Sequence, residues 1–289
     1  MDNNLNFEKY ADLIVNIGLG LHAGDKLSIR MSEPSLALAR LVAKKAYQKG
    51  ASDVRLDFSD DTITLDRYLH APDEAFEIYP DYQVDYSENL FKDGYHVLNL
   101  YAPNPDLLKP ADPARIAQWQ KVAGKAVKRI QHYTMQNEVK WCVTAVACPA
   151  WAAAAFPELS EEEAMQKLWD NIFMATRVDQ PDPVAAWEEH DLKLKAHRKF
   201  LNDARFDRVH YQGPGTDLMV GLVNNHVWEG GSGFSQKGDR FFPNIPTEEV
   251  FSMPDADRVD GTLRATMPLS VRGQIVDKFH FTFKDGKVV

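Results

Sequence analysis

The chain has 289 residues, enough for one large or two ordinary domains with a buried core, and its 44% hydrophobic and 26% charged residues are ordinary for a globular protein. Its 42 Asp and Glu residues outnumber 33 Lys and Arg residues, which gives a formal net charge of −9. This acidic balance, without a basic block, argues against nucleic acid or an anionic membrane as a main partner.

The first part of the chain alternates between helical and strand patterns. Apolar residues recur at a helical period from Phe7 to Ile17, alternate as in a strand from Lys26 to Met31, and become helical again after Glu33-Pro34. Gly50 is placed to end that second helix, and Asp53 to Phe58 has the next strand pattern. This strand–helix–strand order predicts parallel strands joined by a right-handed crossover.

The alternation continues to about residue 205. Further elements are expected in this order: a strand at His96–Tyr101, a helix at Pro113–His132, a strand at Lys140–Val146, a helix opened by a capping box of Ser160 and Glu163, and a helix from Asp182-Pro183 with Val184, Trp187, Leu194 and Phe200 inward. Residues 1–205 are therefore predicted to form an α/β domain, an open and mostly parallel sheet flanked by helices.

Short alternating runs separated by Gly, Pro and Asn replace the helices after residue 205. We expect residues 206–289 to be the start of a β-rich second domain. The glycine-rich runs at residues 213–216 and 230–233 do not have the spacing of a phosphate-binding loop, and we interpret them as tight turns between strands. Asp285-Gly286 is a strong hairpin turn, but only three residues follow it, too few for a normal return strand.

Several features suggest a cytoplasmic protein. No run of about 18 apolar residues could span a bilayer, and the amino-terminal residues are acidic and amphipathic, unlike a signal peptide. The two cysteines, Cys142 and Cys148, make neither a disulfide framework nor a zinc knuckle. We expect both to be small buried hydrophobic residues.

The stretch from Phe241 to Gly261 holds the candidate functional residue. Three prolines surround an extended run, Thr247 to Met253, which contains two adjacent carboxylates, Glu248 and Glu249. Successive strand residues point to opposite faces, so Glu249 would share the more apolar face with Phe251 and Met253. A carboxylate there is costly to bury unless a cation or strong donors meet it, although most strand glutamates are simply solvated.

Three other candidate sites are weaker. The acidic run that begins at Asp255 does not have calcium-loop spacing, because Gly261 is seventh and Thr266 twelfth, and a solvated turn explains it better. His190 and His197, seven apart on one helix, do not match the spacing of a zinc helix and suit surface or packing roles. No nucleophile elbow marks a Ser or Cys hydrolase.

The run PNIPTEEVFSMPDADRVDG resembles the signature of the thermophilic metalloaminopeptidase family, of the aminopeptidase T and aminopeptidase S type. Three further stretches agree: Phe156 to His190, His210 to Leu222 and Gly50 to Leu56. The resemblance implies a hydrolase, a cytoplasmic metalloprotease that removes N-terminal residues from peptide substrates. It also implies two divalent metal ions (Zn, Co, Mg or Mn), Glu249 as one metal ligand, and a homodimer.

The family's remaining metal ligands have no counterpart in these 289 residues, so the resemblance implies an amino-terminal portion whose second domain is truncated and which lacks a complete metal site. We expect this chain alone to be inactive. The alternative is a non-catalytic binding or scaffold protein built from the same portion of the family. A different α/β hydrolase or a nucleotide-binding enzyme is disfavoured, since neither a nucleophile elbow nor a phosphate motif is present.

Overall fold

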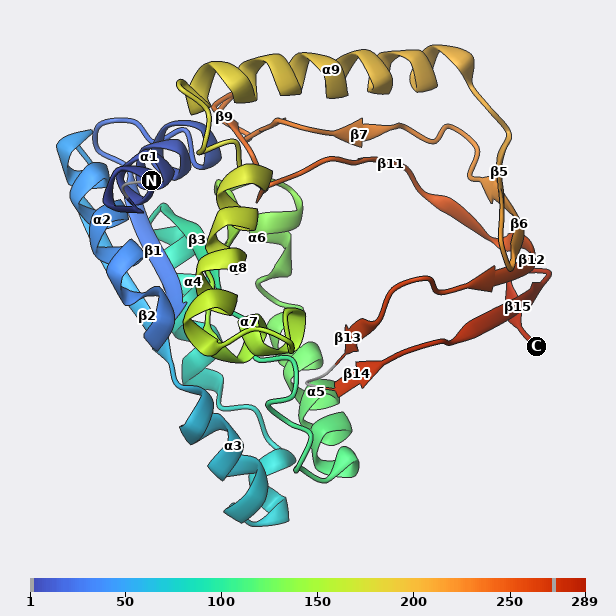
Figure 1. Cartoon of the computed structure of the whole chain (residues 1–289), viewed down its shortest axis with the longest axis horizontal. Coiled ribbons are helices and arrows are strands. Elements are labelled where there is room, and N and C mark those ends of the chain that lie inside the picture. Colours follow the sequence, from blue (N-terminus) through green and yellow to red (C-terminus); the bar gives the residue numbers. More distant parts are fainter. Residues whose placement is uncertain (1–2, 272–273) are drawn as a thin grey trace. The chain divides into compact units, whose positions relative to one another are not determined.

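The computed structural model describes residues 3–271 and 274–289, and the chain divides into two compact units (Figure 1). Unit 1 combines Met1–Trp187 with Ser232–Pro246, and unit 2 combines Glu188–Gly231 with Thr247–Val289. The chain therefore crosses between the units three times. The division into domains at residues 1–205 and 206–289 remains a prediction, and each unit is described by itself.

Unit 1 contains a five-stranded parallel sheet with the strand order β10-β4-β3-β1-β2. Its strands are β1 (Lys26–Ser32), β2 (Asp53–Ser59), β3 (Tyr95–Tyr101), β4 (Trp141–Ala145) and β10 (Asn244–Ile245). The first four agree with the predicted strands to within one or two residues. The expected α/β class with a parallel sheet and flanking helices is confirmed.

Helices flank this sheet. They are α1 (Asn3–Leu13), η1 (Ile14–Gly18), η2 (Glu33–Ser35), α2 (Leu36–Gln48), α3 (Asp61–His70), η3 (Asp73–Phe76), α4 (Asp81–Lys92), α5 (Pro113–Val127), α6 (Gln131–Met135), α7 (Pro149–Ala155), α8 (Glu161–Ala175) and α9 (Pro183–Ala204), which continues into unit 2. The single helix predicted at Pro113–His132 is thus two helices. The predicted capping box of Ser160 and Glu163 is present at α8. Among the described residues, no helix is long and apolar enough to cross a membrane.

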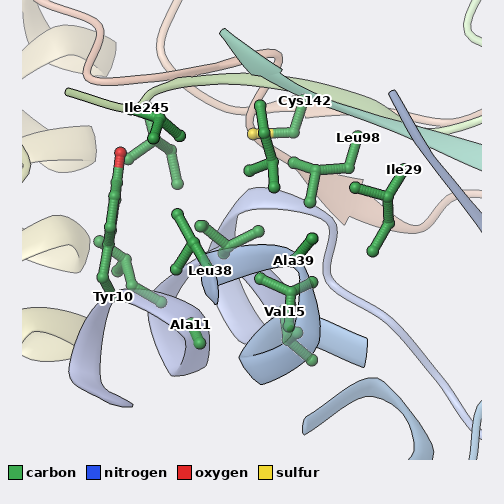
Figure 2. Packing of buried hydrophobic residues seen from close by; sticks show 14 of the residues in the cluster. Tyr10, Ala11, Val15, Ile29, Leu38, Ala39, Leu98, Cys142 and Ile245 are labelled. Carbon is green, nitrogen blue, oxygen red and sulfur yellow. The ribbon is translucent and has the colours of Figure 1, made fainter. Parts of the chain in front are cut away.

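The main core of unit 1 lies between the sheet and helices α1 and α2 (Figure 2). Leu38 and Ala39 of α2 pack in the same cluster as Ile29 and Leu98 of the sheet. Gly18 permits close packing here, because an added Cβ would lie 3.0 Å from the Cys142 sulfur. Cys142 is thus a small buried residue, as predicted.

Strand β10 was not anticipated, because the stretch that contains it was assigned to the second domain. Phe241, Phe242 and Ile245 are all buried, and the Thr144 hydroxyl donates to the Ile245 carbonyl at 2.8 Å. The two adjacent phenylalanines are separated from Ile245 by Pro243 and Asn244, and this run has no strand or helix period. Their burial follows from a tertiary contact 101 residues apart in sequence, which local pattern does not reveal.

The predicted buried stripe of α9 is only partly correct. Trp187 and Leu194 are buried, but Val184 and Phe200 are exposed. The helix turns about 100° per residue, so Phe200 lies roughly 140° around the helix from Trp187. Phe200 is therefore off the buried stripe.

Unit 2 is built on an antiparallel sheet with the order β16-β15-β12-β6-β5. The strands are β5 (Arg208–Gly213), β6 (Thr216–Leu222), β12 (Pro254–Arg264), β15 (His280–Lys284) and β16 (Lys287–Val288). The predicted Asp285-Gly286 turn is present, with positive φ at both residues. Shorter pairs are β7 (Glu229–Gly230) with β11 (Val250–Phe251), and β13 (Leu269–Val271) with β14 (Gln274–Val276); β8 (Gly233–Phe234) and β9 (Arg240–Phe241) pair in unit 1.

Candidate metal centre around Glu249

Glu249 lies directly before the two-residue strand β11 in unit 2, and its side chain is exposed. The extended run predicted at Thr247 to Met253 is therefore regular only at Val250 and Phe251. Phe251 and Met253 are 55% and 66% exposed. The more apolar face that Glu249 is expected to share with these two residues is therefore open to solvent among the described residues.

The backbone beside Glu249 is held closely even though its side chain is exposed. Gly230, in the paired strand β7, has φ +152°, and an added Cβ would lie 2.5 Å from the Glu249 carbonyl oxygen. Only glycine permits this approach of two backbones. The second glycine-rich run thus includes a strand pairing that positions Glu249, in addition to the turns that its composition predicts.

A buried histidine holds the other end of the same segment. His190 Nε2 lies 2.7 Å from the Thr247 carbonyl oxygen, which accepts its hydrogen bond, and 3.5 Å from the Glu248 carboxylate. His190 is 9% exposed, whereas His197 is exposed. The expected packing role of His190 is thus a specific contact to the residues before Glu249, and the 57-residue separation explains why no sequence pattern showed it.

The aspartates after Glu249 do not form the expected turn. Asp255, Asp257 and Asp260 all lie within β12, the central strand of the antiparallel sheet. Strand β12 accommodates them because a register shift occurs between Pro254 and Val259, and Gly261 lies against the Asp217 carbonyl, where an added Cβ would meet it at 2.1 Å.

The donors needed for a metal ion are not assembled in the described part of the chain. No group of three or more His, Cys, Asp or Glu side chains there could hold an ion. A two-metal site needs several ligands for each ion, and one exposed carboxylate cannot supply them. The residues present therefore do not fit a metal centre by themselves, and no reaction step is derived through one.

The cysteines offer no alternative nucleophile. Cys142 and Cys148 are both buried, and burial raises the pKa of each thiol above its ordinary value. A thiol held in its neutral form is a poor nucleophile. Their predicted structural role agrees with this environment.

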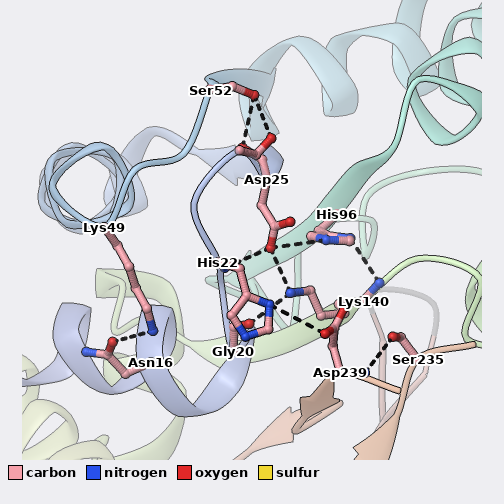
Figure 3. Close-up of polar contacts among 11 residues, drawn as sticks. Asn16, Gly20, His22, Asp25, Lys49, Ser52, His96, Lys140, Ser235 and Asp239 are labelled. Carbon is pink, nitrogen blue, oxygen red and sulfur yellow. Dashed lines mark hydrogen bonds and ion pairs between the residues drawn. The ribbon is translucent and has the colours of Figure 1, made fainter. Parts of the chain in front are cut away.

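Unit 1 contains a polar cluster that the sequence did not indicate (Figure 3). Lys140, His96 and Asp25 precede or begin strands β4, β3 and β1, so they meet at the amino edge of the parallel sheet. Ligands of open α/β sheets bind at the opposite, carboxyl edge. We interpret the cluster as structural.

A family model described as thermophilic metalloprotease (M29) matches residues 3–289, and the chain belongs to that family. The family resemblance drawn from the PTEE segment is confirmed.

The matching relatives are aminopeptidases. Aminopeptidase 2 of Geobacillus stearothermophilus is 44% identical over 282 residues, 98% of this chain and 68% of the relative. Aminopeptidase T of Thermus aquaticus is 38% identical over 284 residues, 98% of this chain and 70% of the relative. The solved structure of wild-type AmpT from Thermus thermophilus superimposes with a TM-score of 0.92 at 35% identity, covering 99% of this chain and 70% of that chain.

Proposed function

We propose that this chain is part of a metal-dependent aminopeptidase, a hydrolase that removes N-terminal residues from peptides. The observation that carries the proposal is the match of the M29 family over residues 3–289, together with aminopeptidase relatives at 37–44% identity. These matches do not favour the scaffold alternative. We further propose a cytoplasmic homodimer, on the resemblance alone.

Within this function, we propose that two divalent metal ions carry out the hydrolysis and that Glu249 is a ligand to one of them. The support is the family resemblance of the PTEE segment and the exposed carboxylate on a closely held backbone. Gly230 and His190 fix the chain on either side of Glu249. A ligand fixed in this way loses less freedom when it binds a metal ion, because metal geometry tolerates only small errors.

The other ligands are proposed to come from outside these 289 residues. Two observations support this proposal: the described side chains assemble no group of three or more metal donors, and the chain covers 68–70% of the matched relatives. We propose that the 289 residues alone bind catalytic metal weakly and hydrolyse peptides poorly.

The experiment compares two proteins. One is the 289-residue chain, and the other is a chimera that joins it to the part of the Geobacillus stearothermophilus aminopeptidase outside the match. Both are assayed on aminoacyl-p-nitroanilides with added Co²⁺ or Zn²⁺, and with EDTA as the control. Hydrolysis by the chimera that EDTA abolishes supports the function. A folded chimera that is inactive with every metal contradicts it, and full activity of the shorter chain contradicts the proposed origin of the ligands.

A further inference from the structure

A cavity of about 430 Å³ lies within unit 1, and Glu249 is not among the residues that line it. Strands β1 and β2, helix α4 and the residues from the end of α5 into α6 line it; Figure 1 shows where these elements lie in unit 1. Its volume is within the range of about 300–1,000 Å³ that small-molecule sites occupy. Nothing in the proposed peptide hydrolysis uses this cavity.

One wall of the cavity is apolar and well fixed. Val84 and Phe91 of α4 and Ile130, before α6, are 3%, 7% and 8% exposed and belong to one core cluster. Tyr79 adds an aromatic face, held by stacking on Trp119 with ring centroids 5.2 Å apart. This wall can accept an apolar or aromatic side chain of a ligand without rearranging the core.

The cavity lining also carries one positive and one negative charge. Arg30 of β1 and Asp57 of β2 are register partners in the parallel sheet, and both line the cavity. Arg30 Nε lies 3.9 Å from Asp57 Oδ2, beyond hydrogen-bonding distance, and the side chains are 44% and 45% exposed. The two groups therefore attract one another weakly and keep donors and lone pairs for a third molecule.

We propose that this cavity binds a free α-amino acid with a large apolar or aromatic side chain. The Arg30 guanidinium would bind the α-carboxylate, and the Asp57 carboxylate the α-ammonium, so the two opposed charge pairs lie side by side. The side chain would pack against Val84, Phe91 and Ile130. Arginine suits the first role, because its planar donors match a carboxylate.

Each part of this ligand is needed for the fit. A carboxylate alone would leave Asp57 facing a like charge, and an amine alone would leave Arg30 without an acceptor. A small amino acid would leave the apolar wall unfilled. The proposal does not rest on the aminopeptidase function, although an aminopeptidase releases free amino acids.

The test is a titration of the 289-residue chain with L-phenylalanine by calorimetry and ligand-observed NMR, in EDTA so that no metal-dependent step contributes. The comparison ligands are N-acetyl-L-phenylalanine, L-phenylalaninamide and glycine, which lack the ammonium, the carboxylate and the side chain respectively. We expect saturable, weak binding of L-phenylalanine, and affinities lower by about tenfold or more for the other three, since a hydrogen bond to a charged group contributes that order.

Variants locate the site. Arg30→Gln and Asp57→Asn should each weaken binding about tenfold, and Ser87→Trp, which fills the cavity from α4, should abolish it. The matched controls are Arg55→Gln, on β2 outside the cavity lining, and Asp66→Asn, an exposed residue of α3; both should bind as the parent does. Near-ultraviolet circular dichroism verifies that each variant is folded.

Three results would overturn the proposal: no saturation at the solubility limit of L-phenylalanine, equal binding of the N-acetyl or amide analogue, or unchanged binding by folded Ser87→Trp. If a variant does not fold, the analogue series on the parent chain still decides. Loss of peptide hydrolysis in the chimera would have no bearing on these outcomes, because binding is measured without metal.

Discussion

The Lys140 ammonium, whose side chain is fully buried, lies 2.8 Å from the Asp25 carboxylate and 2.8 Å from the Gly20 carbonyl oxygen (Figure 3). The Lys140 backbone amide donates to His96 Nδ1 at 3.1 Å, which leaves His96 Nε2 to carry its proton toward Asp25 at 3.5 Å. These contacts join the starts of β1, β3 and β4 at one edge of the sheet. An ion pair of a fully buried lysine therefore links three strands of unit 1.

Removing the Lys140 charge should destabilise the chain strongly. Lys140→Met leaves the Asp25 carboxylate without its cation, and breaking a buried ion pair costs about 3–5 kcal/mol. Asp25 keeps 21% exposure, so we expect about 3 kcal/mol, the lower end of that range. Urea unfolding followed by circular dichroism measures the loss.

The matched control is Lys26→Met, because Lys26 pairs with Asp93 at 2.9 Å on the surface. This substitution should lower the free energy of unfolding by less than about 1 kcal/mol. Equal losses for the two variants would contradict the structural role of Lys140.

The same cluster should make stability fall in acid. Burial acts to raise the pKa of Asp25, but hydrogen bonds from His96, Lys140 and the His22 amide outweigh it and hold that pKa well below its usual range. Burial is the main cause that lowers the pKa of His96. Both folded values lie below the unfolded ones, about 3.9 and about 6.5, so the unfolded chain binds more protons and stability is lost as pH falls.

The expected loss therefore begins below about pH 6.5 through His96 and continues below about pH 3.9 through Asp25. Unfolding free energies measured across this range should decrease steadily with acid. His96→Gln should flatten the upper part of the curve and leave the lower part. An unchanged curve between about pH 6.5 and 5 in this variant would mean that His96 is not held neutral by the fold.

Gly230→Ala should loosen the backbone that carries Glu249. The added Cβ would overlap the Glu249 carbonyl oxygen at 2.5 Å, so one strand has to move, at a cost of about 1–3 kcal/mol. We expect faster hydrogen exchange in residues 248–252. Gly213→Ala is the control, since a Cβ there meets no atom within 4 Å. Unaltered exchange in Gly230→Ala would show that Gly230 does not fix this segment.

Ile245→Ala tests the assignment of β10 to the core of unit 1. Ile245 is 1% exposed and packs in the main cluster, so truncation should cost about 2–5 kcal/mol. Ile275→Ala, at a residue that is 46% exposed in unit 2, should change stability by less than about 0.5 kcal/mol. Similar small effects at both positions would argue that Phe241–Pro246 does not belong to the folded core.

Local sequence patterns predicted most of the strands and helices of unit 1. They missed strand β10, whose stretch was assigned to the second domain. Strand periods located β1, β2, β3 and β4; β1, β3 and β4 bury one face or a nearly continuous apolar run, whereas β2 keeps the strand pattern although it is largely exposed. The same approach missed β10, where Ile245 pairs with the distant residue Thr144. It also took the aspartates of β12 for a turn, since composition resembles a turn even where neighbouring strands impose an extended backbone.

The candidate site also shows how little local sequence patterns reveal about contacts between distant residues. The family resemblance proposed Glu249, but the glycine-rich run that contains Gly230 was interpreted as a tight turn, and the contact between His190 and Thr247 arises only on folding. The apolar neighbours add no burial around Glu249, because Phe251 and Met253 are exposed. The sequence did not predict the Lys140–Asp25 pair either, because a lone lysine before a strand gives no sign that its side chain will be buried.

The most direct test of the account is the kcat/KM of the metal-loaded chimera for an aminoacyl-p-nitroanilide, compared between Glu249→Ala and Glu248→Ala. The two carboxylates are adjacent and both exposed, and Glu248 differs in lying 3.5 Å from His190 Nε2, so Glu248→Ala reports the loss of a neighbouring carboxylate that is not the proposed ligand. The account predicts a loss of about 100-fold or more for Glu249→Ala, with less bound metal, and a loss of less than about tenfold for Glu248→Ala, since removing a ligand disturbs both metal binding and activity. A chimera that keeps its activity and its metal content after Glu249→Ala would contradict the central claim.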